Sequence, residues 1–269
     1  SLIKGSGIVK NFLMICFCLL ILNSDQAIWA SSSLNNKSSS VLSERLLNWP
    51  NWSLPIPFRS VDLEQDLTYP YFFEGVWQVY SVDLGDKNTN FLTHEAKFQL
   101  DGEDRVRGDR SFNAKSLGKE LFGKHLIDVQ NDSNSFNRQI AIFQGGEYLE
   151  TKIVGRKQEL DKENFFLTDE LHLQTFHSNS ITRVNQVETL SRYRLCKDLE
   201  IFSNSISSNS ICGEQWQAKY NFPNNILRST PISTNHFLLF LISDQDQIPL
   251  KELLADLSTQ KDQLTADYH

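Results

Sequence analysis

Apolar and polar residues alternate through most of the chain between residues 75 and 243. In residues 95–100 and 215–222 every apolar side chain occupies an even position, which is the period of a strand with one buried face. Further strands are predicted, from β-branched and aromatic residues, at residues 76–82, 138–143, 148–154, 165–176, 187–195 and 237–242. This pattern predicts an all-β domain over residues 58–243, in which about eight to ten antiparallel strands form a barrel or sandwich.

Two segments show helical periodicity instead. Residues 113–122 are followed by Gly123, a residue type that often ends a helix, and have three apolar residues on one face: Ala114, Leu117 and Leu121. Residues 249–264 begin with a proline and repeat leucine at spacings of three and four. The sequence therefore predicts a short helix inserted among the strands and a C-terminal amphipathic helix within residues 244–269.

Residues 1–30 have the pattern of a signal peptide. Lys4 and Lys10 precede the apolar core 12–22, which is too short for a membrane-spanning helix of roughly 20 residues. Small and β-branched residues at 28–30 favour cleavage near Ala30, and an uncleaved anchor is the alternative. We expect an exported protein that has no integral membrane span after processing.

Residues 31–57 are interpreted as a spacer before the barrel. Residues 31–43 are rich in serine and asparagine and have no periodicity. The prolines of residues 49–58 favour an extended segment, and the two tryptophans there favour docking on a surface.

Charge and motif content limit the function classes. With 26 basic and 33 acidic side chains the net charge is −7, which argues against a nucleic-acid partner. The motifs of serine hydrolases, zinc proteases and phosphate-binding loops are missing from the sequence, and we identify no catalytic or metal-ligating set. His172 and His177 are five positions apart, which places them on opposite faces of a regular strand and disfavours a shared metal.

Two cysteines follow the leader, Cys196 and Cys212. In an exported protein they are candidates for a disulfide that closes a loop of about 15 residues and stabilises by roughly 3 kcal/mol. Two unpaired buried thiols are the alternative.

The most specific local signal is Gly75-Val76-Trp77, at the start of the first long predicted strand. It resembles the Gly-x-Trp opening of lipocalins and other calycin barrels. The resemblance implies that Gly75 lets the chain turn sharply beneath the barrel and that Trp77 closes its end. It also implies that Arg192 or Arg194 lies across Trp77. The alternative is that Trp77 is an ordinary core residue.

A wider resemblance covers residues 45–222. The chain is similar to a domain-of-unknown-function family of cyanobacteria and plant chloroplasts, through RLLNWP at 45–50, YPYFFEGVW at 69–77, GDRSFN at 108–113, NRQ at 137–139, VGR at 154–156, VETLSRYR at 187–194 and ICGEQW at 211–216. The resemblance implies a lipocalin-like barrel located in the thylakoid lumen or the bacterial periplasm. It implies no established reaction.

Charged residues on the predicted strands supply the candidate site. One hypothesis is an anion-reading end of a ligand pocket, for a propionate or a lipid carboxylate, formed by Arg138, Arg156, Glu170, Arg192 and Arg194. The alternative is a satisfied polar network, or exposed outer strand faces, with Glu170 and Glu188 as partners. Asp109 and Arg110 are expected to form an ion pair and to cap the inserted helix.

Three functions follow from these features. The leading hypothesis is an exported barrel that binds a small apolar or amphiphilic molecule such as a pigment or lipid. The second is a non-catalytic assembly or maintenance factor for a photosynthetic, thylakoid-membrane protein complex, which it contacts through residues 49–58 or the C-terminal helix. The third is a calycin-type enzyme acting on a pigment or lipid. A cavity favours the first, a filled barrel with an exposed aromatic patch the second, and a carboxylate or histidine inside the cavity the third.

Overall fold

The computed structural model describes residues 40–54, 56, 66–86, 91–161, 164–196, 210–221, 230–243 and 258. The predicted leader lies outside these residues, as does the predicted C-terminal helix apart from Ser258. Within the described ranges, no helix combines the length and the apolar character needed to cross a membrane.

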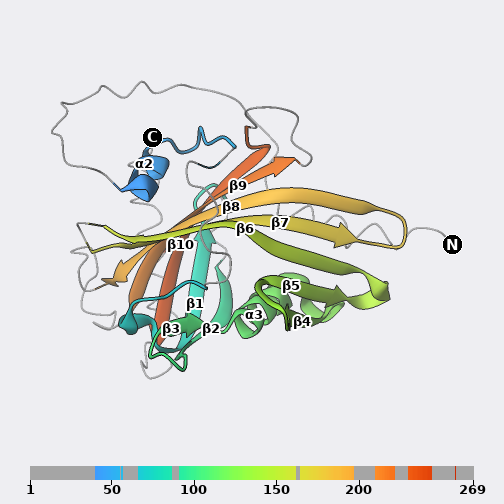
Figure 1. Ribbon diagram of the computed structural model, residues 1–269, viewed down its shortest axis with the longest axis horizontal. Helices are drawn as coiled ribbons and strands as arrows, with labels where there is room; N and C mark the ends of the chain where they lie inside the picture. The colour runs from blue at the N-terminus through green and yellow to red at the C-terminus, as the bar shows by residue number, and fades with distance from the viewer. Residues whose placement is uncertain are drawn as a thin grey trace.

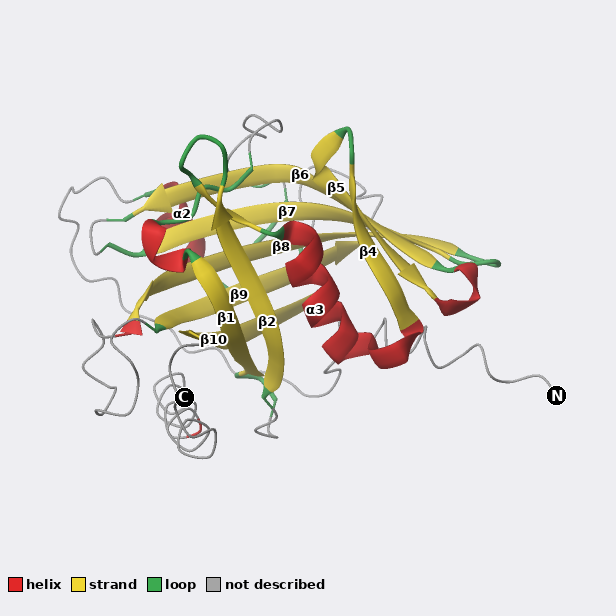
Figure 2. Cartoon of the chain, turned by 90° about the horizontal axis from the view of Figure 1, so that it is seen from below, coloured by secondary structure: helices red, strands yellow, loops and turns green. Residues whose placement is uncertain are grey.

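Ten antiparallel strands form one sheet that curls into a half-barrel (Figures 1 and 2). They are β1 (Gly75–Asp83), β2 (Leu92–Leu100), β3 (Val106–Gly108), β4 (Leu126–Asp132), β5 (Ser135–Phe143), β6 (Tyr148–Leu160), β7 (Phe166–His177), β8 (Thr182–Leu195), β9 (Ile211–Asn221) and β10 (Ser233–Ser243). Their order across the sheet is β3-β2-β1-β10-β9-β8-β7-β6-β5-β4, so β3 and β4 are the edges. The predicted all-β, antiparallel fold class is confirmed.

Alternation and β-branched or aromatic content together predicted every strand except β3 and β4. β3 has three residues, and β4 buries only Leu126 and Val129 among its seven. Neither strand offers enough buried positions for a period of two to be visible.

Helix α3 (Arg110–Phe122) connects the two edge strands and packs against β2 and β4. In Figure 2 it lies across the open side of the curled sheet. The Asp109 carboxylate caps the helix by accepting a hydrogen bond from the Phe112 N–H at 3.2 Å, and Gly123, with φ of 55°, follows its last residue. The helix ends where the sequence predicted and begins three residues earlier. Short 3-10 helices occupy Tyr71–Phe73, Gly123–His125 and Gln144–Gly146.

Part of the interior is filled by aromatic and aliphatic side chains. Trp77 is 4% exposed, packs with Phe73, Phe98 and Phe166, and donates its indole N–H to the Phe73 carbonyl oxygen at 2.7 Å. Gly75 has φ of 134°, a conformation that L side chains rarely adopt, two residues before Trp77. Trp77 is therefore a core residue in the filled part of the half-barrel.

A second apolar layer covers the outer face of β7, β8 and β9. It consists of α2 (Val41–Leu47) and the residues that follow, and its buried members pack on the sheet side chains Leu167, Leu171, Leu190, Trp216 and Tyr220. Trp52 is 1% exposed and donates its indole N–H to the Arg45 carbonyl oxygen at 2.7 Å. The spacer interpretation is therefore wrong for residues 41–54. Helix α2 has only seven residues, too few to show a helical repeat in the sequence.

Candidate functional site

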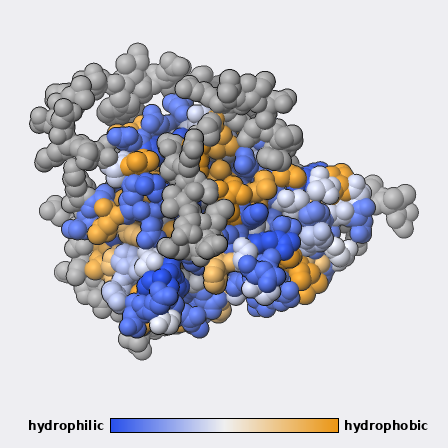
Figure 3. Space-filling view, in the orientation of Figure 1, coloured by the Kyte–Doolittle hydropathy of each residue, from blue (hydrophilic) through white to orange (hydrophobic). Residues whose placement is uncertain are grey.

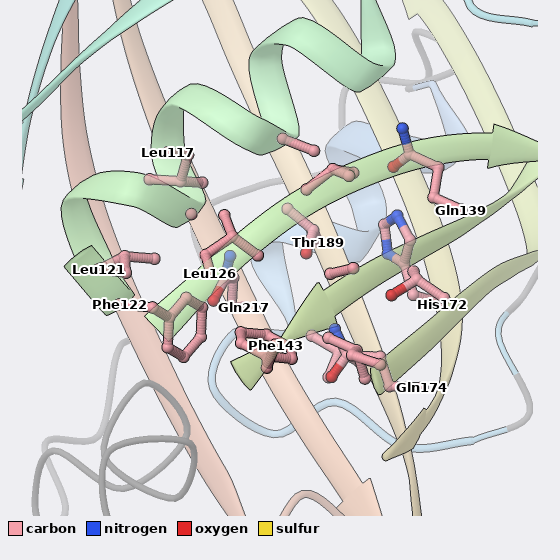
Figure 4. A pocket seen from close by; sticks show the side chains of 17 residues that line it. Leu117, Leu121, Phe122, Leu126, Gln139, Phe143, His172, Gln174, Thr189 and Gln217 are labelled. Carbon is pink, nitrogen blue, oxygen red and sulfur yellow. The ribbon is translucent and has the colours of Figure 1, made fainter. Parts of the chain in front are cut away.

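A cavity of about 360 Å³ lies between α3 and the concave face of the sheet. One wall, from α3, β4 and the last residues of β5, is apolar and includes Ala114, Leu117, Leu121, Phe122, Leu126 and Phe143. The opposite wall, from β6 to β9, carries Thr151, His172, Gln174, Thr189 and Gln217. In Figure 4 the leucine and phenylalanine side chains gather on one side, and Gln139, His172 and Gln174 lie on the other. The cavity is therefore amphipathic.

Strand register explains how the polar wall is assembled. Side chains that are direct cross-strand neighbours share one face of the sheet. One such row, in order across β9, β8, β7 and β6, is Gln217, Thr189, Glu170 and Arg156. A second row, across β7, β6 and β5, is Gln174, Thr151 and Gln139. His172 lies between the two rows, two residues from each along β7.

A charged network adjoins this wall. The Glu170 carboxylate accepts hydrogen bonds from the Arg156 Nε at 2.7 Å and the Arg110 Nη2 at 2.9 Å. Arg110 also donates its Nε to both oxygens of Asp66, at 2.8 and 2.9 Å. The His172 Nε2 lies 3.5 Å from the Glu170 Oε2. His172 therefore connects the cavity to this network.

The network keeps Glu170 ionised. Burial by itself raises the pKa of this carboxyl group, but the positive charge of Arg110, the hydrogen bond from His172 and the charge of Arg156 together hold the pKa well below its usual value. The two arginines are balanced by two carboxylates, those of Asp66 and Glu170. The cavity wall itself differs in character, since none of the described residues that line it is Asp, Glu, Lys or Arg.

Of the five predicted ligand-binding residues, the structure brings together Arg156 and Glu170. Arg138 is on the other face of β5 from Gln139 and forms ion pairs with Glu150 and Asp132, at 2.8 and 2.7 Å. It therefore lies away from the cavity.

Arg192 and Arg194 also lie outside the cavity. Their guanidinium carbons are 4.7 and 4.4 Å from the centre of the Phe165 ring, and Arg192 is also paired with Glu214. The expectation that one of them crosses Trp77 is therefore wrong. Side chains alternate along β8, and it is Tyr193 between them that packs toward the core containing Trp77.

The expected pairing of Asp109 with Arg110 is also replaced by other contacts. Asp109 caps α3 as expected, whereas Arg110 points to Asp66 and Glu170. Asp66 could not be predicted as a partner of Arg110, because the two residues are 44 positions apart along the chain.

A second charged cluster is buried on the outer face, beneath α2. Arg45 pairs with Glu188, and the Tyr220 hydroxyl donates to the Glu188 Oε2 at 2.8 Å. Asp169 beside them is fully buried, and its pKa is raised well above the usual value by burial and by the negative charge of Glu188. Sequence reasoning considered Glu188 as an arginine partner but did not single out Arg45 or Asp169.

Cys196 and Cys212 are joined by a disulfide in the structure, with their Cα atoms 5.0 Å apart. The Cys196 N–H also donates to the Ser210 carbonyl oxygen at 2.8 Å, where β8 ends and β9 begins. Both cysteines pack with Val82, Leu238 and Phe240. The polar run 203–209 between them lies outside the described residues.

The described part of the chain shows no metal site. Figure 3 shows hydrophobic and hydrophilic residues interspersed over one face of the molecule. Among the described ranges, no group of three or more His, Cys, Asp or Glu side chains is arranged to hold a metal ion.

Comparison with known proteins places the cavity within a recognised domain. A family model described as a domain of unknown function (DUF6816) matches residues 83–225. The matched segment contains α3 and the strands β2 to β9, and therefore all the residues that line the cavity. No curated protein and no solved structure matches the chain.

Proposed function

This chain belongs to the family of the domain of unknown function DUF6816, and we propose that the domain binds one small amphiphilic molecule in the cavity between α3 and the sheet. The proposal keeps the leading hypothesis from the sequence, a ligand-binding barrel. The amphipathic cavity is the observation that carries it.

The size and lining of the cavity support this function. Ligand sites are typically concave, mostly apolar and about 300–1,000 Å³ in volume, with a few polar groups that orient the ligand. The cavity of about 360 Å³ is at the small end of that range and has this composition. It suits a single acyl or isoprenoid chain with a compact head. A lipid-like ligand is therefore favoured over a large pigment.

The half-barrel also provides a means of access. Helix α3 covers the gap between the two edges of the sheet by packing on β2 and β4. It is not joined to them by a ladder of backbone hydrogen bonds like the one that joins neighbouring strands. Gly118 lets α3 lie close to Leu126 of β4, because a Cβ atom at this position would lie only 2.7 Å from the Leu126 Cδ2. A small movement of α3 would open the apolar wall without breaking the sheet.

Ligand binding can be tested by native mass spectrometry of protein purified from its own host, followed by calorimetry with the molecule that is found. Ala141→Phe places a phenyl ring in the cavity wall and is expected to abolish binding. Ile140→Phe is the matched control, because the neighbouring residue of β5 faces the other way. Equal binding by both variants would contradict the proposed site.

An enzyme is the second candidate, because the cavity contains a histidine with a carboxylate behind it. His172 lines the cavity and its Nε2 lies 3.5 Å from Glu170, an arrangement suited to proton transfer. His172→Gln should then stop conversion of the bound molecule even at ligand concentrations that saturate the cavity, as read by mass spectrometry of the products.

The assembly-factor hypothesis has less support at one of its two proposed contacts. Within residues 49–58, Trp52 and Leu54 are buried against this chain's own sheet. The C-terminal helix, the other proposed contact, lies outside the described residues.

We also propose that the protein is exported, to the thylakoid lumen or the periplasm of a photosynthetic organism. The disulfide between Cys196 and Cys212 supports an oxidising location, where such bonds persist. N-terminal sequencing of the native protein tests the proposal, with a start near Ser31 expected. A native protein that keeps residues 12–22 in a reducing compartment would overturn it.

A further inference from the structure

We infer that the ligand carries a neutral oxygen-bearing head, such as an alcohol or a ketone, and is not a carboxylate. This inference rests on the proposed function and specifies the class of molecule that the cavity takes. It also replaces the sequence-based hypothesis of an anion-reading pocket.

The arginines near the cavity are already engaged. Arg156 and Arg110 both donate to Glu170, and Arg110 also holds Asp66. Arg156 approaches Asp66 as well, with its Nη2 3.4 Å from the Asp66 Oδ1. A ligand carboxylate would therefore have to displace a carboxylate of the protein to reach a guanidinium group.

The wall that faces the cavity offers neutral hydrogen-bonding groups. Among the described residues, the side chains of Thr151, Gln174 and Thr189 line the cavity and make no hydrogen bond to one another or to other side chains. Hydroxyl and amide groups can both donate and accept, which suits an alcohol or a carbonyl oxygen. If only an apolar chain occupied the cavity, these groups would lose their water partners and remain unpaired. That loss would weaken binding of a ligand with no polar head.

The position of Glu170 makes an anionic head unfavourable. Thr189 is its direct cross-strand neighbour, so a head bound at Thr189 would be close to the Glu170 carboxylate. The pKa of Glu170 is held well below its usual value, so this negative charge persists at neutral pH. A ligand carboxylate in this partly apolar cavity would be poorly solvated, and it would find no uncompensated positive charge, because Asp66 and Glu170 already balance Arg110 and Arg156.

His172 adds an acceptor that is suited to an alcohol. A tautomer that directs its Nε2–H toward Glu170 leaves Nδ1 as an acceptor. An alcohol can donate to this nitrogen and accept from the Thr189 hydroxyl or the Gln217 amide, which is the next residue across the sheet. A carboxylate has no proton to donate to Nδ1.

The test compares two ligands of equal chain length by calorimetry at about pH 8, where a fatty acid is ionised. Decan-1-ol is expected to bind the full mature chain at least about tenfold more tightly than decanoate, because desolvation of an unpaired carboxylate costs more than the 1.4 kcal/mol that corresponds to tenfold. Thr189→Val should weaken decan-1-ol binding by about fivefold through the loss of one hydrogen bond.

Two further variants make the test specific. Thr175→Val removes a threonine hydroxyl of β7 that lies on the opposite face from His172. This variant should change the affinity for neither decan-1-ol nor decanoate. Gln174→Lys places a cation in the cavity wall and should shift the preference toward decanoate. Circular dichroism melts establish that each variant is folded.

The outcomes separate this inference from the function on which it rests. Tighter binding of decan-1-ol, weakened by Thr189→Val and not by Thr175→Val, supports the neutral head. Binding of decanoate equal to or tighter than that of decan-1-ol overturns the neutral head but leaves a ligand-binding cavity. Binding of neither molecule, together with no ligand in the native protein, overturns both.

Discussion

Arg45 of α2 and Glu188 of β8 form a bidentate ion pair, with Nε 2.8 Å from Oε1 and Nη2 2.7 Å from Oε2. The two residues are 143 positions apart, and the Glu188 side chain has no exposed surface. The guanidinium carbon also lies 4.8 Å from the centre of the Trp52 ring. The pair therefore fastens the N-terminal layer to the outer face of the sheet.

Replacing Arg45 by methionine should lower the free energy of unfolding by about 3–5 kcal/mol. Removal of one partner from a buried ion pair leaves the other charge uncompensated, here beside the second carboxyl group of Asp169. Arg105→Met is the matched control, because Arg105 pairs with Asp101 and Glu103 while its side chain is 40% exposed. The control should lose less than about 1 kcal/mol. Equal losses in denaturant melts would contradict the role given to Arg45.

Asp169→Asn should change how stability depends on pH. The pKa of Asp169 is raised in the folded protein, so the folded state holds the proton at pH values where the unfolded chain, with its usual pKa of 3.8, has released it. The native protein therefore loses stability as the pH rises from 3.8 to the folded pKa, by about 1.4 kcal/mol for each unit of the shift.

The asparagine variant has no such proton to lose. Its stability relative to the parent should rise with pH through that window and then become constant. Denaturant melts at several pH values measure the difference. A difference that stays the same from acid to neutral pH would show that Asp169 ionises normally.

Trp77→Ala should cost about 3–5 kcal/mol, because it removes a large buried ring from the filled part of the half-barrel. Trp77→Phe keeps much of the packing but loses the hydrogen bond to the Phe73 carbonyl oxygen, so a smaller loss is expected. The prediction fails if the alanine variant and the parent share the same denaturation midpoint.

Reduction of the Cys196–Cys212 bond should lower stability by roughly 3 kcal/mol without unfolding the domain, because the closed loop spans 16 positions and the sheet has its own core. A Cys196→Ala, Cys212→Ala double variant should show a similar loss and no further effect of reductant. Peptide mapping under non-reducing conditions measures the bond in the native protein. Two alkylatable thiols in freshly isolated protein would refute it.

The contacts of the charged residues could not be predicted from the sequence. The strand pattern points to Arg156 and Glu170 as charged residues on strands, but their contact depends on the register of β6 against β7. Arg192 and Arg194 alternate with Tyr193 on β8, and the sequence did not show which set faces the interior. Both faces of this strand are covered, since Leu190 is buried on one and Ser191 on the other. When both faces are covered, the sequence pattern predicts a strand but does not show which of its side chains face the interior.

The local elements of this protein could be predicted from its amino-acid sequence: most of the strands, the end of α3 at Gly123, and the all-β class. These features depend on side-chain alternation and backbone preferences, which act between residues close in the chain. Only the folded chain shows that α3 covers a hollow part of the half-barrel, that α2 docks on the outer face, and that Arg110, Arg156, Asp66 and Glu170 share one network. Those relationships depend on strand register and on contacts between distant segments, because the cavity is formed only when the sheet has curled and α3 has packed across its open side.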